Sequence, residues 1–208
     1  MTDFEDVVAA YGLRPDELER LHRIDAVLCE TNVHTNLISR STTAHRVVRH
    51  YADSLQLWPH LPESARTLLD IGSGGGFPAL PLAVMAAERR PDLALTLCES
   101  VRKKASFLEQ AADAADLSNV TVRNVRAEAL TDRFEVVTAR AVASLDKLLA
   151  LAVPLLRPGG TLIAPKGRRA SEELDEAKKT WRMTAKRVKS KTDPDAVVLI
   201  LTDMERRS

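Results

Sequence analysis

The sequence is poor in cysteine and in aromatic residues, and it contains no long apolar run. Two cysteines, Cys29 and Cys98, are too few for a disulfide framework or a thiolate metal site, and they fit a reducing compartment. No apolar run approaches the roughly 20 residues that a membrane-spanning helix needs, and the start MTDFEDVVAA lacks the form of a secretory signal. We therefore expect a cytoplasmic protein that does not enter a membrane.

Metal-ligand patterns and coiled-coil heptads are also missing. The five histidines show no ligand spacing with one another or with the cysteines, so we expect no bound metal. Because no exposed heptad predicts a helical partner, we expect a monomer.

The charge is balanced overall but unevenly distributed. The formal net charge is +1, yet residues 157–191 hold 11 basic residues against 4 acidic ones. A second basic zone, between Ser39 and Tyr51, contains Arg40, Arg46 and Arg49 and no acid. Two such zones predict an anionic partner such as RNA lying between them.

The order of apolar segments predicts an α/β protein of 208 residues with a helical N-terminal extension. Residues 1–62 have helical periodicity and form a predicted cap, which ends where Pro59 and Pro62 interrupt the pattern. Residues 63–208 alternate strands with helices, which predicts a Rossmann-like core with a mostly parallel seven-stranded sheet. The expected strands are 67–71, 93–98, 120–124, 134–139, 161–165, 182–191 and 196–202, of which the last two form an antiparallel hairpin. The expected helices of the core are 77–89, 101–116, 144–156 and 171–180.

A glycine-rich turn, LDIGSGGGFP, is the strongest local signal. The first expected strand enters the turn at Gly72, which is followed by Gly74 to Gly76 and then by a helix. Glycines allow close approach of a ligand, and the free N–H groups of a helix start attract a carboxylate such as that of S-adenosylmethionine. A tight turn without a ligand is the plainer interpretation. A dinucleotide is disfavoured, because its fingerprint needs a small residue where Phe77 stands.

Glu99 follows the second expected strand, at the sheet edge that the glycine turn also occupies. A carboxylate there can accept both ribose hydroxyls of a nucleoside, which suits the adenosine of the same donor. The alternative is a solvated acid at a strand end.

The segment after the fourth strand bears on the type of reaction. It has neither the Asn/Asp-Pro-Pro-aromatic sequence of amino-group methyltransferases nor the cysteine nucleophile of pyrimidine C5 enzymes. A guanine N7 atom carries a free lone pair, so its methylation needs alignment but no proton acceptor. Arg140 suits the O6 and N7 acceptors of guanine or contact with the cofactor. A structural salt bridge with Asp146 or Glu128 is the alternative.

Two basic residues, Lys166 and Arg168, follow the fifth expected strand at the same edge of the sheet. This position sets Lys166 apart from the other lysines of the basic zone, and a solvated loop lysine is the alternative. Arg168, as part of the same basic zone, is a candidate to bind RNA.

These motifs resemble the ribosomal RNA small subunit methyltransferase G family, also called glucose-inhibited division protein B, whose members methylate guanine N7. The resemblance spans nearly the whole chain. It rests on the segments NLIS at 36–39, RHYADSL at 49–55, the glycine turn, Glu99-Ser100, Ala127-Glu128, residues 139–145 and Lys166-Gly167. One departure is Ala79, where the family usually has glycine, and its methyl group removes no polar contact.

The resemblance implies a class I methyltransferase fold with S-adenosylmethionine as cofactor and S-adenosylhomocysteine as product. It implies 16S ribosomal RNA or the small ribosomal subunit as partner and a guanosine N7 as target. It also implies that Arg140 is the catalytic residue beside the reactive methyl group and that Lys166 and the cluster from Arg40 to Arg49 face RNA. Residues implied to contact the donor are Gly72, Gly74, Phe77, Glu99, Ala127, Glu128 and Arg140.

Two rival functions remain open. A small-molecule methyltransferase on the same fold would need a closed apolar pocket, for which 4% aromatic residues offer little material. An RNA-binding factor that has lost donor binding would be the rival without catalysis, and the intact glycine turn and Glu99 argue against it.

Overall fold

A seven-stranded sheet in the order β3-β2-β1-β4-β5-β7-β6 organises the chain. The computed structural model describes residues 3–207. β1 to β5 run parallel to their neighbours, whereas β7 is antiparallel to both β5 and β6. The strands are β1 Thr67–Ile71, β2 Ala94–Cys98, β3 Val120–Arg123, β4 Phe134–Ala139, β5 Leu156–Lys166, β6 Trp181–Lys189 and β7 Val197–Arg206. The predicted α/β class and the C-terminal hairpin are therefore confirmed.

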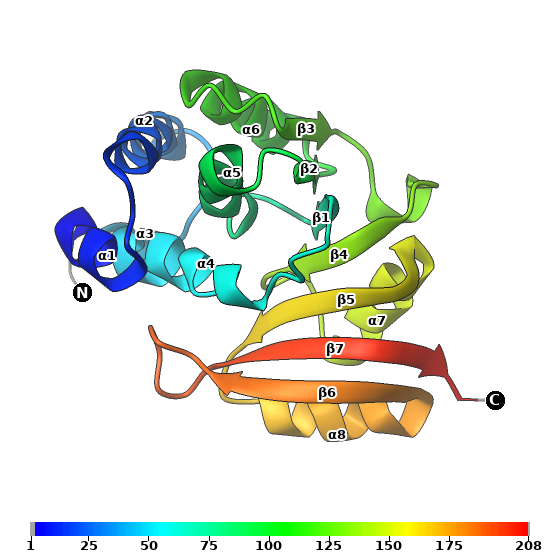
Figure 1. Cartoon of the computed structure of the whole chain (residues 1–208). Coiled ribbons are helices and arrows are strands. Elements are labelled where there is room, and N and C mark those ends of the chain that lie inside the picture. The colour runs from blue at the N-terminus through cyan, green and yellow to red at the C-terminus, as the bar shows by residue number, and fades with distance from the viewer. Residues whose placement is uncertain (1–2, 208) are drawn as a thin grey trace.

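Helices cover both faces of the sheet (Figure 1). α5 (Ala79–Arg89) and α6 (Arg102–Ala114) lie on one face, and α7 (Leu145–Ala152) and α8 (Ala170–Thr180) lie on the other. Each face has its own apolar cluster, because alternate residues of a strand point to opposite sides. β1 pairs with β2 on one side and β4 on the other. The strand order therefore reverses at β1, and ligands of such sheets bind beyond the carboxyl ends of the strands at this point.

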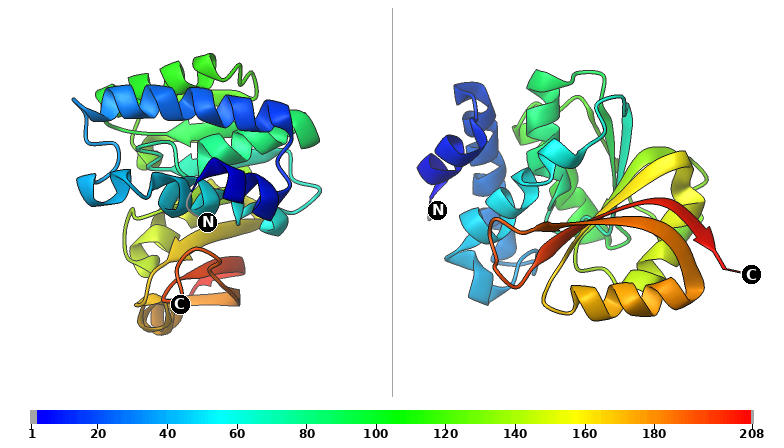
Figure 2. Two further views of the ribbon diagram at one scale, coloured as in Figure 1. Left: turned by 90° about the vertical axis from the view of Figure 1, so that its left-hand side faces the viewer. Right: turned by 60° about the horizontal axis from the view of Figure 1, so that its bottom comes forward.

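The N-terminal helices form a further layer against α5 and α6 (Figure 2). Leu21, Ile24 and Leu28 of the longest cap helix are fully buried in the same apolar cluster as α5 and α6. Truncating one of them to alanine costs about 2–5 kcal/mol. The cap consists of α1 Phe4–Tyr11, α2 Pro15–Asn32, α3 Arg40–Thr43, η1 Val47–Ala52, α4 Asp53–Leu55 and η2 Trp58–His60, of which η1 is a π-helix. None of the helices within residues 3–207 is long and apolar enough to cross a bilayer.

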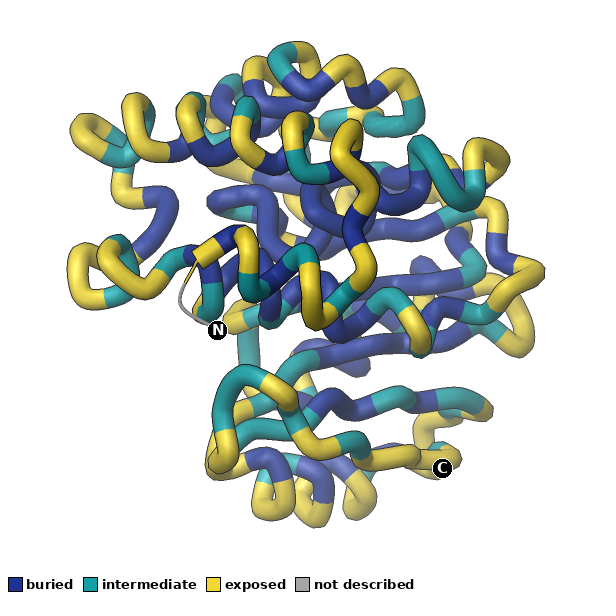
Figure 3. The backbone as a smooth tube through the Cα atoms, turned by 60° about the vertical axis from the view of Figure 1, so that its left-hand side comes forward, coloured by how far each residue is buried: buried dark blue, intermediate teal, exposed yellow. Residues whose placement is uncertain are grey.

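The element boundaries differ from the prediction around the fifth strand. β5 begins at Leu156 rather than at residue 161, and α7 ends at Ala152. The Pro-Gly-Gly sequence at 158–160 predicts a turn, but the chain passes it as an irregular strand, with a register shift against β4. β7 also runs on to Arg206, because β6 pairs with it beyond the apolar residues. Residues 157–159 and most of residues 203–206 are exposed, so no apolar pattern predicts these parts of the two strands. Figure 3 shows the burial of the whole backbone.

Candidate active site

The glycine turn lies at the carboxyl end of β1 and is fastened to β2. The N–H groups of Gly72 and Ser73 both donate to the carbonyl of Cys98, at 2.8 and 3.1 Å. Gly72 has a φ of 68°, and a Cβ built on it would lie 2.9 Å from Cγ2 of Val142. A side chain at this position would therefore be strained and would meet the loop that follows β4.

Glu99 is buried beside this turn, as its place after β2 predicts. Its Oε2 accepts a hydrogen bond from the N–H of Gly74 at 2.9 Å, and its Oε1 accepts from the N–H of Val101 at 2.8 Å. Each carboxylate oxygen has a second lone pair for a hydroxyl group. The side chain thus fixes the turn and keeps acceptor capacity for a ligand.

Asp70, a buried acid inside β1, also adjoins the turn. Its Oδ1 accepts a hydrogen bond from Thr138 Oγ1 at 2.7 Å, while its Oδ2 has no hydrogen-bond partner within residues 3–207. Burial raises the pKa of Asp70 to about 6, against the opposing effect of hydrogen bonds from Ser73 and Thr138. A buried carboxylate oxygen without a partner is uncommon in proteins, and this one lies on the strand that leads into the turn.

A short 3₁₀ helix, η3 (Ala127–Ala129), follows β3. Ala127 is buried in the same apolar cluster as Ile71 and Cys98, whereas Glu128 is exposed. After burial, the charges of Glu99 and Glu128 both help to raise the pKa of the Cys98 thiol to about 11, so both acids act on the same thiol. That Ala127 and Glu128 contact adenine stays a prediction.

Arg140 lies at the end of β4, and the cap surrounds its guanidinium group. Nη2 is 2.9 Å from His50 Nδ1, and Nη1 donates to the carbonyl of Arg49 at 3.0 Å. Nη1 also lies 3.4 Å from Asp53 Oδ2. The guanidinium carbon lies 5.3 Å from the centre of the Phe77 ring, within the range of a cation–π contact. Asp53, rather than Asp146 or Glu128, is thus the acid that pairs with Arg140.

The imidazole of His50 is held as a neutral ring. It stacks on Phe77 with the ring centres 5.0 Å apart, and its Nε2 lies 3.1 Å from Thr42 Oγ1. Burial, with the nearby charges of Arg140 and Arg49, lowers the pKa of His50 to about 3. Nδ1 therefore accepts from Arg140, and the proton lies on Nε2.

A cavity of about 660 Å³ opens beside Arg140. Residues 141–143 line it, and Val142 is also the side chain that a Cβ on Gly72 would meet, so this loop borders both the cavity and the glycine turn. The wall comes from the cap, from the end of β5 and from the tip of the hairpin. It includes Thr42, Arg49, His50, Asp53, Arg140, Pro165, Lys166, Thr192 and Asp193.

Known proteins match this chain over almost its whole length. The profile of a family described as "GidB: rRNA small subunit methyltransferase G" matches residues 17–197. The chain is similar to Ribosomal RNA small subunit methyltransferase G of Rhodospirillum centenum, with 41% identity over 207 residues, covering 99% of this chain and 92% of the relative. The protein of the same name from a Ruegeria species is 41% identical over 192 residues, with coverage of 92% and 93%. The chain belongs to the rRNA small subunit methyltransferase G family. The resemblance drawn from the motifs is confirmed.

Solved methyltransferase structures share the fold of this family member. An O-methyltransferase from Bacillus cereus in complex with SAH gives a TM-score of 0.59 at 16% identity, covering 88% of this chain and 91% of that one. TYW2 of M. jannaschii in complex with AdoMet gives 0.54 at 15% identity, with 76% of each chain covered. Identities this low support the fold alone, and the predicted Rossmann-like methyltransferase fold is confirmed.

The predicted RNA-facing residues of the cap lie in different surroundings. Arg40 is exposed, whereas Arg46 is held by Asp25, with Nε and Nη2 each 2.7 Å from a carboxylate oxygen. Arg49 is exposed at the cavity, and its Nη1 lies 2.9 Å from Asp193 Oδ2. Arg46 thus forms a structural ion pair with Asp25 inside the cap. Of these three arginines, Arg40 and Arg49 are exposed to solvent.

The two basic residues after β5 differ in the same way. Lys166 is half-buried, and its Nζ contacts Glu173 Oε2 at 2.9 Å and donates to the carbonyl of Ala143 at 2.8 Å. This lysine therefore supports the cavity wall. Arg168 is 83% exposed, and its nearest acid, Asp195, lies 3.8 Å away.

Several side chains of the site were not singled out from the sequence. His50 and Asp53 appeared only within the segment at 49–55, Asp70 appeared only as part of the turn motif, and Thr192 drew no prediction. For Asp70 a signal existed, because an acid inside an apolar strand needs a reason to be buried. Within residues 3–207, no group of three or more His, Cys, Asp or Glu side chains is arranged to hold a metal ion. That the protein needs no metal stays a prediction.

Proposed function

We propose that this protein transfers a methyl group from S-adenosylmethionine to N7 of a guanosine in 16S ribosomal RNA, with S-adenosylhomocysteine as product. The observation that carries the proposal is the match, at 41% identity over 99% of the chain, to a protein named Ribosomal RNA small subunit methyltransferase G. The glycine turn, Glu99 and Arg140 that the motifs single out also lie around one edge of the sheet. Catalysis therefore fits better than RNA binding alone.

The donor fits the glycine turn and its neighbours. Gly72 adds no side-chain atoms to the turn, where a Cβ would lie 2.9 Å from Val142, and Glu99 beside the turn keeps acceptor capacity for a ligand. Glu99 would hold the ribose, and Ala127 and Glu128 would hold the adenine. When bound, the donor supplies an electrophilic methyl group on its sulfonium. The residues proposed to contact it are Gly72, Gly74, Phe77, Glu99, Ala127, Glu128 and Arg140.

The target base would enter the cavity beside Arg140. An unstacked base costs a few kcal/mol unless the RNA already exposes it, so a looped site suits this enzyme. N7 loses no proton on methylation, so the reaction needs no side chain that acts as a base. Two titratable side chains at the cavity are already bound to other protein groups. His50 is bound to Arg140, and Glu173 to Lys166. Arg140 would orient the O6 and N7 edge of the guanine.

The basic edge strand provides a surface for the phosphate backbone. No acid occurs between Trp181 and Thr192, and none of the basic residues there forms an ion pair within the described chain. β6 is the edge strand, and the β6–β7 hairpin ends at the cavity (Figure 1). Edge lysines also prevent pairing with other sheets, so this role needs a test of its own. The proposed RNA-facing residues are Arg40, Arg49, Arg168, Arg182, Lys186, Arg187, Lys189 and Lys191.

Labelled methyl transfer tests the proposal. The protein is incubated with S-adenosylmethionine carrying a labelled methyl group and with 16S ribosomal RNA or small subunits, and the label in RNA is counted. We expect label in RNA only. Donor binding without label in RNA would favour a small-molecule substrate, and a protein that binds RNA but no donor would be a non-catalytic factor. A monomer in the cytoplasm fits the proposal, and both stay predictions.

A further inference from the structure

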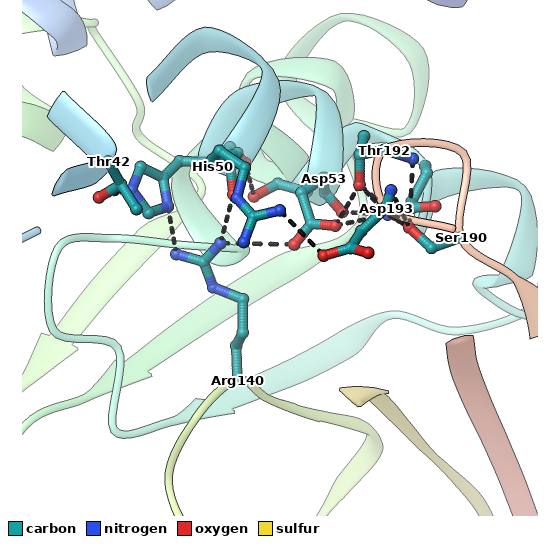
Figure 4. A network of polar contacts seen from close by, with 10 residues as sticks. Thr42, His50, Asp53, Arg140, Ser190, Thr192 and Asp193 are labelled. Carbon is teal, nitrogen blue, oxygen red and sulfur yellow. Dashed lines mark hydrogen bonds and ion pairs between the residues drawn. The ribbon is translucent and has the colours of Figure 1, made fainter. Parts of the chain in front are cut away.

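A polar network joins three segments that lie far apart in the sequence (Figure 4). Asp53 of the cap stands at its centre. Its Oδ1 accepts a hydrogen bond at 2.7 Å from Thr192 Oγ1, which is 139 residues away in the sequence. Its Oδ2 lies 3.4 Å from Arg140 Nη1, 87 residues away. One carboxylate therefore contacts both the C-terminal hairpin and the arginine of the proposed site.

Further bonds fasten the hairpin tip, residues 190–193, to the cap. Gln56 Oε1 accepts from the backbone N–H of Lys191 at 2.8 Å, and Gln56 Nε2 donates to Asp53 Oδ1 at 2.7 Å. Asp193 pairs with Arg49 at 2.9 Å. Gln56 and Arg49, which flank Asp53 in the sequence, thus bind the hairpin tip. The bonds from Gln56 and Thr192 fix the direction of the Asp53 carboxylate.

The π-helix η1 explains how the cap reaches Arg140. The backbone N–H of Asp53 reaches the carbonyl of Val48, five residues earlier, and the carbonyl of Arg49 accepts from Arg140 Nη1 at 3.0 Å. The wider turn brings this carbonyl, the His50 ring and the Asp53 carboxylate to one guanidinium group. Single π-helical turns of this kind are frequent at functional sites.

We propose that Asp53 is a positioning residue for Arg140, and that the hydroxyl of Thr192 holds Asp53 in place. The proposal rests on the function proposed above, in which Arg140 orients the target base. Without the Asp53 charge, Nη2 of Arg140 keeps its contact with His50 and Nη1 keeps its bond to the Arg49 carbonyl, but the carboxylate that also draws Nη1 toward the hairpin is lost. A displacement of about 1 Å in such a group can cost on the order of 10²-fold in rate. The plainer alternative is that the network only fastens the hairpin to the cap.

Two variants distinguish a positioning role of Asp53 from a purely structural one. Asp53→Asn keeps the shape of the side chain but removes its charge, and Thr192→Val removes the hydroxyl that binds Asp53. The matched control is Thr202→Val, on the same hairpin, whose hydroxyl bonds only to the exposed Asp203 in the structure. The single-turnover rate of methyl transfer is measured at saturating donor and RNA, together with RNA affinity and melting temperature. We expect Asp53→Asn to be slower by at least about tenfold and Thr192→Val by a smaller factor, with RNA affinity unchanged.

The double variant of Asp53→Asn with Arg140→Ala decides whether Asp53 acts through Arg140. If it does, Asp53→Asn causes no further loss of rate once Arg140 is gone, because residues that act as a unit are not additive. Independent, additive losses would overturn the proposal, and so would a wild-type rate for Asp53→Asn. If Asp53→Asn does not fold, Thr192→Val decides, and a wild-type rate for it overturns the proposal. A wild-type rate for Arg140→Ala alone would instead remove the proposed role of Arg140.

Discussion

His50 Nδ1 lies 2.9 Å from Nη2 of Arg140, so a histidine of the cap serves as a hydrogen-bond acceptor for the arginine after β4. The bond requires a neutral ring, because a protonated Nδ1 would face a guanidinium group. Burial and two arginines lower the pKa of His50 to about 3, so that the ring stays neutral through the physiological range.

The stability of the protein should therefore depend on pH through His50. Above pH 6.5 the ring is neutral in both states, and its contribution is fully present. Between 6.5 and about 3 only the unfolded state binds the proton, so the free energy of unfolding falls. The fall is about 1.4 kcal/mol for each pH unit. Urea unfolding at pH 7.5 and 5.5 measures it.

His50→Gln is the control for this pH effect, because its amide oxygen can accept from Arg140 but does not titrate. Asp70, whose pKa is raised to about 6, acts in the opposite sense and is common to both proteins. We expect the variant to lose less stability than the wild type between the two pH values. Equal losses would show that His50 is not held neutral.

Replacing Arg140 should slow methyl transfer while the fold survives. We expect Arg140→Ala to lose on the order of 10²-fold in rate, and Arg140→Lys to lose activity as well, because a lysine cannot reproduce the planar fork. The control, Arg206→Ala, removes an exposed arginine at the far end of β7. The melting temperature of each variant shows whether it is folded. A wild-type rate for Arg140→Ala would exclude the residue from the site.

Glu99→Gln should weaken donor binding. The glutamine has one acceptor oxygen, whereas Glu99 accepts from the N–H groups of both Gly74 and Val101. The variant therefore cannot accept from these two N–H groups and from both ribose hydroxyls as well. Loss of one charge-assisted bond to the donor costs about 1.5–3 kcal/mol, which corresponds to roughly tenfold or more in affinity. Calorimetric titration with S-adenosylmethionine measures this, with Glu109→Gln on the exposed face of α6 as control. Equal affinities of the two variants would contradict the role of Glu99.

The edge strand β6 should contribute to RNA affinity and to its dependence on salt. Alanine in place of Lys186 and Lys189 should weaken RNA binding and lower the salt slope by about 0.7 for each lost contact with single-stranded RNA. Lys147→Ala, an exposed lysine on α7, is the control. If the double variant binds RNA as the wild type does, the lysines only protect the sheet edge.

The sheet and the glycine turn could be predicted from the sequence because their signals are local. Period-two and period-3.6 patterns marked the elements, and the run from Leu68 to Pro78 marked a strand, a turn and a helix start. The 3₁₀ helix Val153–Leu155 extends α7 almost to the predicted end of helix 144–156. The predicted start of the fifth strand at residue 161 was wrong, because the Pro-Gly-Gly at 158–160 forms part of an irregular strand.

The partners of Arg140 were not predicted, since they depend on contacts between distant segments. Asp53 and Thr192 are 139 residues apart in the sequence, and hydrophobic periodicity gives no information about a contact at such a separation. The neutral state of His50 likewise arises from burial under the cap and from Arg140, neither of which is visible in the sequence around it. Lys166 was singled out for its place at a strand end, but its bond to Glu173 became visible only in the structure.

The position of the transferred methyl group tests the central claim most directly. Ribosomal RNA methylated by the wild-type protein is treated with borohydride and then aniline, which cleaves the chain at N7-methylguanosine, and the fragments are mapped. The account predicts one new cleavage in 16S ribosomal RNA, sharply reduced with Arg140→Ala and retained with Arg206→Ala. Label in the RNA without cleavage, or cleavage of equal strength with Arg140→Ala, would contradict it.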